Sequence, residues 1–147
     1  MGGDPCASGE AQGARALLNA RTWQDYEQGI RAMYGDAAFG ARQFRTVIDG
    51  RVVEGVADGV TQMGGRAVAV EAKFAENWRT SIRNPESAIG QAAFAQAEQL
   101  RMLEQARTYS QAFDEVIYHS NSTRLIQHYS GVFAENGLTN VRFIYTP

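Results

Sequence analysis

The sequence predicts a single α/β domain in which helices flank a mixed β-sheet. Three observations support this fold class. Apolar residues recur at helical spacing in several stretches, short runs rich in β-branched residues alternate with those stretches, and Asp49-Gly50 is a dipeptide favoured in tight hairpin turns. The expected order is helix, three strands, helix, strand, helix, strand, so an antiparallel hairpin joins strands that are connected by crossover helices.

The beginning of the chain is predicted to be a linker followed by a helix. Residues 1–13 are glycine-rich and polar without an apolar repeat, so we expect a flexible linker remnant ahead of a domain at 14–147. Apolar residues between 14 and 34 recur at helical spacing. Thr22 would serve as a new N-cap if that helix is interrupted.

Three strands should follow the first helix. The runs at 42–48 and 51–60 flank Asp49-Gly50 and form the hairpin, which makes Asp49 a turn residue. Residues 62–65 then turn the chain into a third strand at 66–74, which reads RAVAVEAKF.

The second half of the chain should alternate between helices and strands. Pro85 followed by Glu86 suits the start of a long helix that ends at about Phe113. Its buried stripe is expected to consist of Ile89, Ala93, Leu100, Leu103, Ala106 and Phe113.

A strand, a helix and a last strand complete the prediction. The strands lie at 115–118 and 141–145, and the helix at 124–135 begins at a Ser122 or Thr123 cap. Asn136-Gly137 closes that helix.

Composition limits the classes of function. The chain has 147 residues, of which 44% are hydrophobic, and it contains neither a basic-then-apolar leader nor an apolar run long enough to span a membrane. The single cysteine, Cys6, excludes an internal disulfide and a cysteine-clustered zinc site. A net charge of −2 does not indicate a basic nucleic-acid-binding surface, although a cleft can still gather several arginines.

The strand at 66–74 carries two charges on one face. Side chains at i and i+2 point the same way in a strand, so Glu71 and Lys73 share a face while Val68, Val70 and Phe74 share the other. Lys73 is the only lysine in the chain, and an ammonium beside an attacking water is not replaceable by a planar guanidinium. The alternative is a structural Glu–Lys pair that contributes about 0.2–1 kcal/mol.

Four further residues are candidates for a site. Asp58 lies near the end of the second strand in GVADGV, where glycines allow close approach of the backbone to a ligand. Glu27 lies on the first helix, and Gln105 and Tyr109, four residues apart, share one side of the long helix. Each of these residues alone is also typical of a solvated charge or a polar group at the edge of a core.

Together these residues resemble the PD-(D/E)xK nuclease superfamily, which has the restriction-endonuclease-like fold. The resemblance covers about 23–118: Asp58 on one strand, Glu71-Ala72-Lys73 on the next, and Gln105-Ala-Arg-Thr-Tyr109 on the following helix. The element order agrees with the family's αβββαβ core, extended here by a helix and a strand. The Q-x-x-x-Y is similar to that of RecB-like and phage-type exonucleases. The proline of the family's motif is replaced by Ala57.

The resemblance implies a role for each candidate residue. Asp58, Glu71, the Ala72 carbonyl and Glu27 would bind Mg²⁺ or Mn²⁺, and Lys73 would position the attacking water. Gln105 and Tyr109 would line the cleft. The nucleic-acid phosphates would be contacted by Arg42, Arg79 and Arg83.

The implied function is metal-dependent hydrolysis of phosphodiester bonds, with DNA as the expected substrate. An RNase of the same fold and a non-catalytic member that binds nucleic acid or protein are the alternatives. A short nuclease-like domain after a glycine-rich lead-in also resembles the C-terminal toxin domain of bacterial polymorphic toxins. That resemblance implies delivery within a larger secreted protein, action in the cytoplasm of a target bacterium, and a cognate immunity protein as partner.

Overall fold

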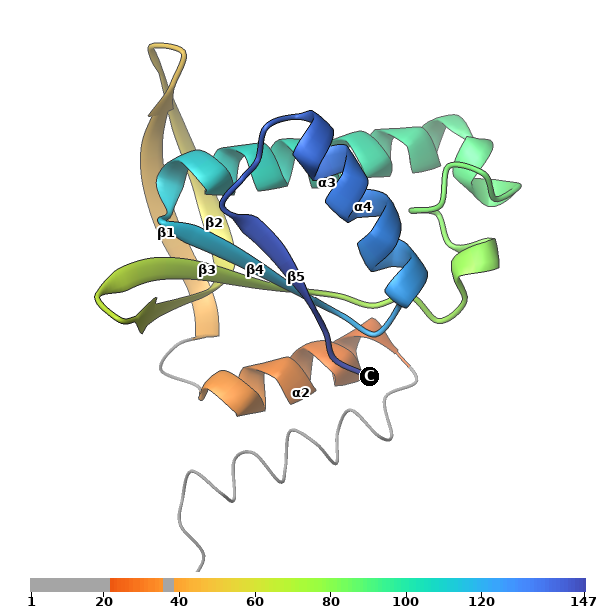
Figure 1. Cartoon of the computed structure of the whole chain (residues 1–147), viewed down its shortest axis with the longest axis horizontal. Helices are drawn as coiled ribbons and strands as arrows, with labels where there is room; N and C mark the ends of the chain where they lie inside the picture. The colour runs from red at the N-terminus through yellow and green to blue at the C-terminus, as the bar shows by residue number, and fades with distance from the viewer. Residues whose placement is uncertain (1–21, 36–38) are drawn as a thin grey trace, which may run out of the picture.

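The computed structural model describes residues 22–35 and 39–147, with only the main chain described at 39–42 and Asp58. Figure 1 shows its helices and strands in their order along the chain. These are α2 (Trp23–Tyr34), β1 (Phe39–Ile48), β2 (Arg51–Met63), β3 (Arg66–Lys73), η1 (Trp78–Thr80), η2 (Ile89–Gln91), α3 (Ala93–Ala112), β4 (Glu115–Ser120), α4 (Thr123–Glu135) and β5 (Val141–Tyr145). The predicted order of helices and strands is confirmed.

The strands form a five-stranded mixed sheet in the order β1-β2-β3-β4-β5. β1, β2 and β3 pair antiparallel, whereas β3, β4 and β5 run parallel. The predicted hairpin turn is confirmed, because Asp49 and Gly50 both have positive φ angles, of 50° and 76°. Two positive φ angles at the centre of a two-residue loop define a type I′ turn, which matches the twist of the flanking strands.

Helices cover both faces of the sheet, with α2 on one side and α3 and α4 on the other (Figure 1). The predicted alternation along β3 is confirmed. Val68 and Val70 pack with Tyr26 and Ile30 of α2, whereas Ala69 belongs to the core cluster under α3 and α4. Glu71, two residues after Ala69, accepts a hydrogen bond from α3 and so lies on the same face as Ala69.

The start of the long helix differs from the prediction. α3 begins at Ala93, and the residues after Pro85 form turns and the short 3₁₀ helix η2. The Ser87 hydroxyl donates to the Asn84 carbonyl and accepts from the Gly90 N–H, which holds the backbone in turns. Short polar side chains that bond to the local backbone compete in this way with helix formation.

The predicted buried stripe of α3 is only partly correct. Leu103, Ala106 and Phe113 contribute to the core, but Ala93 is exposed and Ile89 and Leu100 are 43% and 58% exposed. The buried residues of the helix are Ala95, Met102, Ala106 and Tyr109. The buried face of α3 therefore consists of two alanines, a methionine and a tyrosine, with Leu103 partly buried against the same core.

The capping predictions are confirmed for the other two helices. The Thr22 side chain accepts from the Asp25 N–H at the start of α2, and residues 14–21 of the predicted first helix lie outside the described residues. Ser122 caps α4 at its start, and Gly137 follows that helix with a φ of 72°. No helix in the described part of the chain is long and apolar enough to cross a membrane.

Gly90 provides a stability test, because a Cβ built there would lie 1.7 Å from the Asn84 carbonyl oxygen. We expect Gly90→Ala to lower the free energy of unfolding by about 2 kcal/mol or more, since the backbone of the turn must move. Gly131 in α4 has nothing within 4 Å of the same position, so Gly131→Ala should be stabilising by up to about 1 kcal/mol. Urea denaturation measures both changes, and equal effects would contradict the turn geometry.

Candidate functional site

Glu71 is a carboxylate in the interior of the domain, with 1% of its surface exposed. The Tyr109 hydroxyl donates to Glu71 Oε1 over 3.0 Å, and the Lys73 ammonium lies 3.9 Å from Glu71 Oε2. A buried carboxylate is costly unless donors and an opposite charge meet it. The site therefore begins with a buried ion pair that is supported by a tyrosine from α3.

Lys73 extends this network toward β4. Its side chain is 14% exposed, and its ammonium lies 5.9 Å from the centroid of the Tyr118 ring, within the range of a cation–π contact. Tyr118 is the parallel-register partner of Glu71, and its hydroxyl donates to Gln105 Oε1 over 3.1 Å. The structure thus brings two residues of α3 to the Glu71–Lys73 pair. Tyr109 bonds to Glu71 directly, whereas Gln105 is connected to Lys73 through Tyr118.

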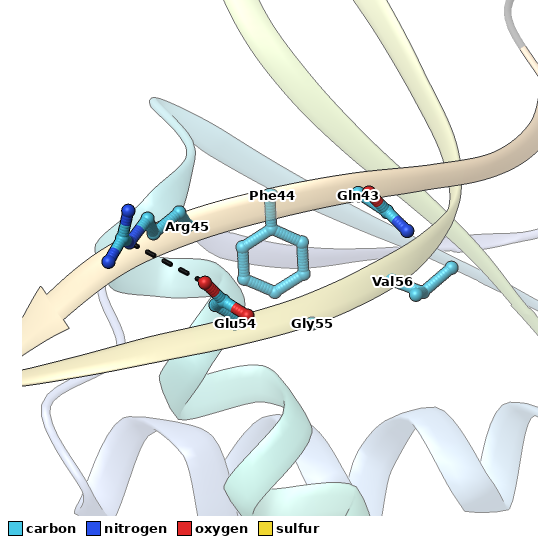
Figure 2. Close-up of a pocket in the computed structure, with 6 residues that line it drawn as sticks. All are labelled: Gln43, Phe44, Arg45, Glu54, Gly55 and Val56. Carbon is cyan, nitrogen blue, oxygen red and sulfur yellow. Dashed lines mark ion pairs between the residues drawn. The ribbon is translucent and has the colours of Figure 1, made fainter.

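An aromatic cluster fixes the position of Tyr109. Its ring meets Phe44 edge-on at a centroid distance of 5.5 Å and Phe113 at 6.0 Å. Figure 2 shows the Phe44 ring beside Gly55, where an added Cβ would lie 2.6 Å from that ring. The glycine therefore makes room for Phe44, and Phe44 in turn supports the tyrosine that bonds to Glu71.

A hollow of about 450 Å³ lies on the hairpin, and Figure 2 shows the residues that line it. Arg45 of β1 and Glu54 of β2 face each other there, with 3.6 Å between the guanidinium and the carboxylate. Its lining consists of Gln43, Phe44, Arg45, Glu54, Gly55 and Val56. None of the predicted catalytic or metal-binding residues contributes to this hollow.

Asp58 is placed by its main chain alone. Gly59 pairs with Val70, so Asp58 and Glu71 occupy the next positions of the same antiparallel register. The register of β1 shifts at this point, because the two residues 40 and 41 lie opposite Asp58. Such β-bulges occur often beside active sites. The side chains of Asp58 and Arg42 lie outside the described residues, and the described side chains include no cluster of three potential His, Cys, Asp or Glu ligands.

A pocket of about 660 Å³ opens where β3 ends against the start of α2, and we call it the α2 pocket. It brings together Glu27, Ala72, Lys73 and Arg83, all predicted site residues. The rest of its lining is Thr22, Trp23, Gln24, Phe74, Glu76 and Ile82.

Arg79 lies in a second pocket of about 390 Å³, which we call the α4 pocket. This pocket is formed by the segment after β3, the start of α4 and the end of β5. Its lining consists of Ala75, Glu76, Asn77, Trp78, Arg79, Asn121, Ser122, Thr123, Arg124 and Tyr145. Glu76 borders both pockets, so the two adjoin at this residue.

Buried hydrogen bonds attach α2, which carries Glu27, to the sheet. The Tyr26 hydroxyl donates to the Thr146 carbonyl over 2.7 Å. The two ring nitrogens of His119 lie 2.6 Å from the Tyr34 hydroxyl and 2.8 Å from the Thr146 hydroxyl. Burial, reinforced by the positive charge of Arg142, lowers the pKa of His119 to about 4, so the ring is neutral at pH 7.

Five residues of the site and its surroundings were not predicted from the sequence: Tyr118, His119, Arg124, Tyr145 and Thr146. Tyr118 and His119 stand in a run that indicates an ordinary buried strand, and only the parallel register brings Tyr118 beside Glu71. The sequence offered one indication that these two residues lie in different surroundings: alternation along a strand places Tyr118 and His119 on opposite faces of the sheet.

Comparison of the chain with models of protein families, with curated proteins and with solved structures finds no match.

The His119 cluster predicts a pH dependence of stability. The pKa of His119 is about 4 in the folded protein, below its ordinary value of 6.5, so the unfolded chain binds more protons between these values. The free energy of unfolding should therefore fall as the pH decreases from about 6.5 to about 4. Urea denaturation at several pH values measures this slope.

His119→Gln should flatten that slope, because it removes the titrating group. The pKa of His128 is also lowered by burial, so His128→Gln is the matched control and should keep the larger part of the slope. An unchanged slope in His119→Gln would contradict the neutral buried imidazole.

Tyr109→Phe tests the contact with the buried carboxylate. The substitution keeps the ring but removes a donor to Glu71, so we expect the free energy of unfolding to fall by about 1.5–3 kcal/mol. Tyr145→Phe removes a hydroxyl from a side chain that is 53% exposed and should change stability by less than about 0.5 kcal/mol. Calorimetry or urea denaturation compares the two variants, and equal losses would argue against the Tyr109 bond.

Proposed function

We propose that this domain is a metal-dependent nuclease of the PD-(D/E)xK superfamily with the restriction-endonuclease-like fold. One observation carries the proposal: the Tyr109 hydroxyl bonds to Glu71, 38 residues away in the sequence, beside the only lysine of the chain. Gln105 reaches Lys73 through Tyr118. The Glu71-Ala72-Lys73 motif of β3 and the Gln105–Tyr109 motif of α3, which both resemble that superfamily's signature, are thus neighbours in space.

The burial of the pair supports a catalytic role over a structural one. A buried ion pair is often no more stabilising than apolar residues of the same volume, because both charges must be desolvated. Ionisable groups of this kind, placed beside a pocket, gather at functional sites. Lys73 both contacts Glu71 and lines the α2 pocket, so this residue links the buried carboxylate to the pocket.

The donor set is compatible with a hard divalent cation. Asp58, Glu71, the Ala72 carbonyl and Glu27 would hold Mg²⁺ or Mn²⁺, and all are the oxygen donors that such ions prefer. A carboxylate has about four acceptor positions, so it can accept from donors such as Tyr109 and also coordinate a cation. When bound, the ion supplies charge stabilisation and lowers the pKa of a coordinated water.

The remaining roles belong to side chains of the two pockets. Lys73 would hold the attacking water and balance the negative charge that develops on the phosphate. Arg83 in the α2 pocket and Arg79 in the α4 pocket would bind phosphates of the substrate. Tyr109 would fix the orientation of the Glu71 carboxylate, and α2 would hold Glu27 at the mouth of the pocket.

DNA is the proposed substrate, and the proposed setting is interbacterial competition. In that setting the domain is the C-terminal toxin part of a longer delivered protein and cleaves DNA in the cytoplasm of a target bacterium. A cognate immunity protein would protect the producing cell.

Cleavage assays test this function. Plasmid, linear DNA and total RNA are incubated with the purified domain, with Mg²⁺ and separately with EDTA. We expect Mg²⁺-dependent degradation that falls by at least about 100-fold in Glu71→Gln and in Lys73→Met, because each change removes a charge from the reacting centre. Gel analysis of the products measures the rates and distinguishes DNA from RNA as substrate.

Arg51→Gln is the control, since it removes a positive charge at the hairpin turn, away from both pockets. Circular dichroism establishes that the variants are folded. Degradation that persists in both site variants, or that is insensitive to EDTA, would refute the proposed site.

A further inference from the structure

At least half of the arginines whose side chains are described form ion pairs with glutamates. This group consists of Arg45, Arg66, Arg101, Arg107 and Arg142. Within the described ranges, by contrast, Arg51, Arg79, Arg83 and Arg124 form no salt bridge. Three of these four line the α2 and α4 pockets. Guanidinium groups left without a carboxylate partner are suited to bind phosphate.

The three pocket arginines lie along one edge of the domain. Figure 1 shows the starts of α2 and α4 and the end of β5 at the same side, with the β1–β2 hairpin turn that carries Arg51 away from them. Arg83 borders the α2 pocket beside Lys73, whereas Arg79 and Arg124 border the α4 pocket. The linings of the two pockets together contain Lys73 and three arginines against Glu27 and Glu76, and the excess of positive charge lies in the α4 pocket, beyond the reacting centre.

Each pocket also has a largely exposed aromatic side chain. Trp23 in the α2 pocket is 59% exposed and Tyr145 in the α4 pocket is 53% exposed. Among the described residues, one other aromatic side chain, that of Phe94 on α3, is more than 50% exposed. Cations interleaved with exposed aromatics are typical of proteins that bind single strands, because an unpaired base can stack on a ring. The bases of a duplex are stacked on each other and do not offer their faces.

We propose that the two pockets bind single-stranded nucleic acid. The α2 pocket holds the phosphate that is cleaved; this part of the inference rests on the proposed function. The α4 pocket holds a neighbouring phosphate between Arg79 and Arg124, and Tyr145 stacks against a base. Glu76 at the junction is exposed and repels phosphate, so it sets the division between the two phosphate positions.

Binding measured without cleavage tests this inference. The wild-type domain in EDTA is titrated into a fluorescent single-stranded DNA oligonucleotide and into the duplex of the same sequence, at several salt concentrations. Anisotropy gives the affinity, and each phosphate contact on a single strand contributes about −0.7 to the slope of log K against log salt. We expect tighter binding to the single strand.

The double variant Arg79→Gln/Arg124→Gln should reduce that slope by about 1.4, which corresponds to two lost contacts. Arg51→Gln, also an arginine without a salt bridge, should leave the slope unchanged. Tyr145→Ala should weaken binding by about 5- to 150-fold through lost stacking, whereas Phe94→Ala should not. Glu76→Gln should strengthen binding. Thermal melts establish that each variant is folded.

Three outcomes would overturn the inference. They are equal slopes for the double variant and Arg51→Gln, tighter binding to the duplex than to the single strand, and no binding by the wild type. These outcomes are separate from the cleavage assay. Cleavage that persists without the expected binding pattern refutes the inference alone, whereas the expected binding pattern without cleavage refutes the proposed nuclease.

Discussion

The buried carboxylate of Glu71 is the constraint on which the rest of the site depends. A charge with 1% exposure requires nearby donors, and α3 must therefore present Tyr109 toward β3. The ring of Tyr109 is in turn supported by Phe44 of β1. Gly55 is small for the same reason, since any larger residue would displace Phe44. A single polar group thus determines residues on β1, β2 and α3.

The mixed sheet explains why the pockets lie where they do. β3 pairs antiparallel with β2 and parallel with β4, so it connects the hairpin half of the sheet to the crossover half. The regular pairing of β3 with β2 stops at Val70, whereas Glu71 to Lys73 pair with β4. The two pockets open beyond these residues, against α2 and the start of α4. The bulge opposite Asp58 interrupts the regular hairpin beside this space. The polar residues of the candidate site are therefore concentrated at the end of β3, the central strand of the sheet.

Local rules were sufficient for much of the fold and for part of the site. Thr22 and Ser122 as caps, Asp49-Gly50 as a turn, and the shared face of Glu71 and Lys73 follow from propensities and periods that act over a few residues. The start of α3 could not be predicted. Pro85 favours a helix, but the close packing of Gly90 against Asn84 holds this segment in turns. The roles of Tyr118 and of the arginines without salt bridges depend on strand register and on distant partners, which no short pattern records.

The contact between Tyr26 and Thr146 joins residues 120 positions apart. During synthesis, α2 emerges from the ribosome before the strands on which its apolar face rests, and Tyr26 bonds to a residue that follows β5. A nascent chain must therefore keep that face unpaired until translation of the domain is nearly complete. For a domain proposed to destroy nucleic acid, this order of assembly delays the placement of Glu27, so the proposed site forms only after β5 has been synthesised.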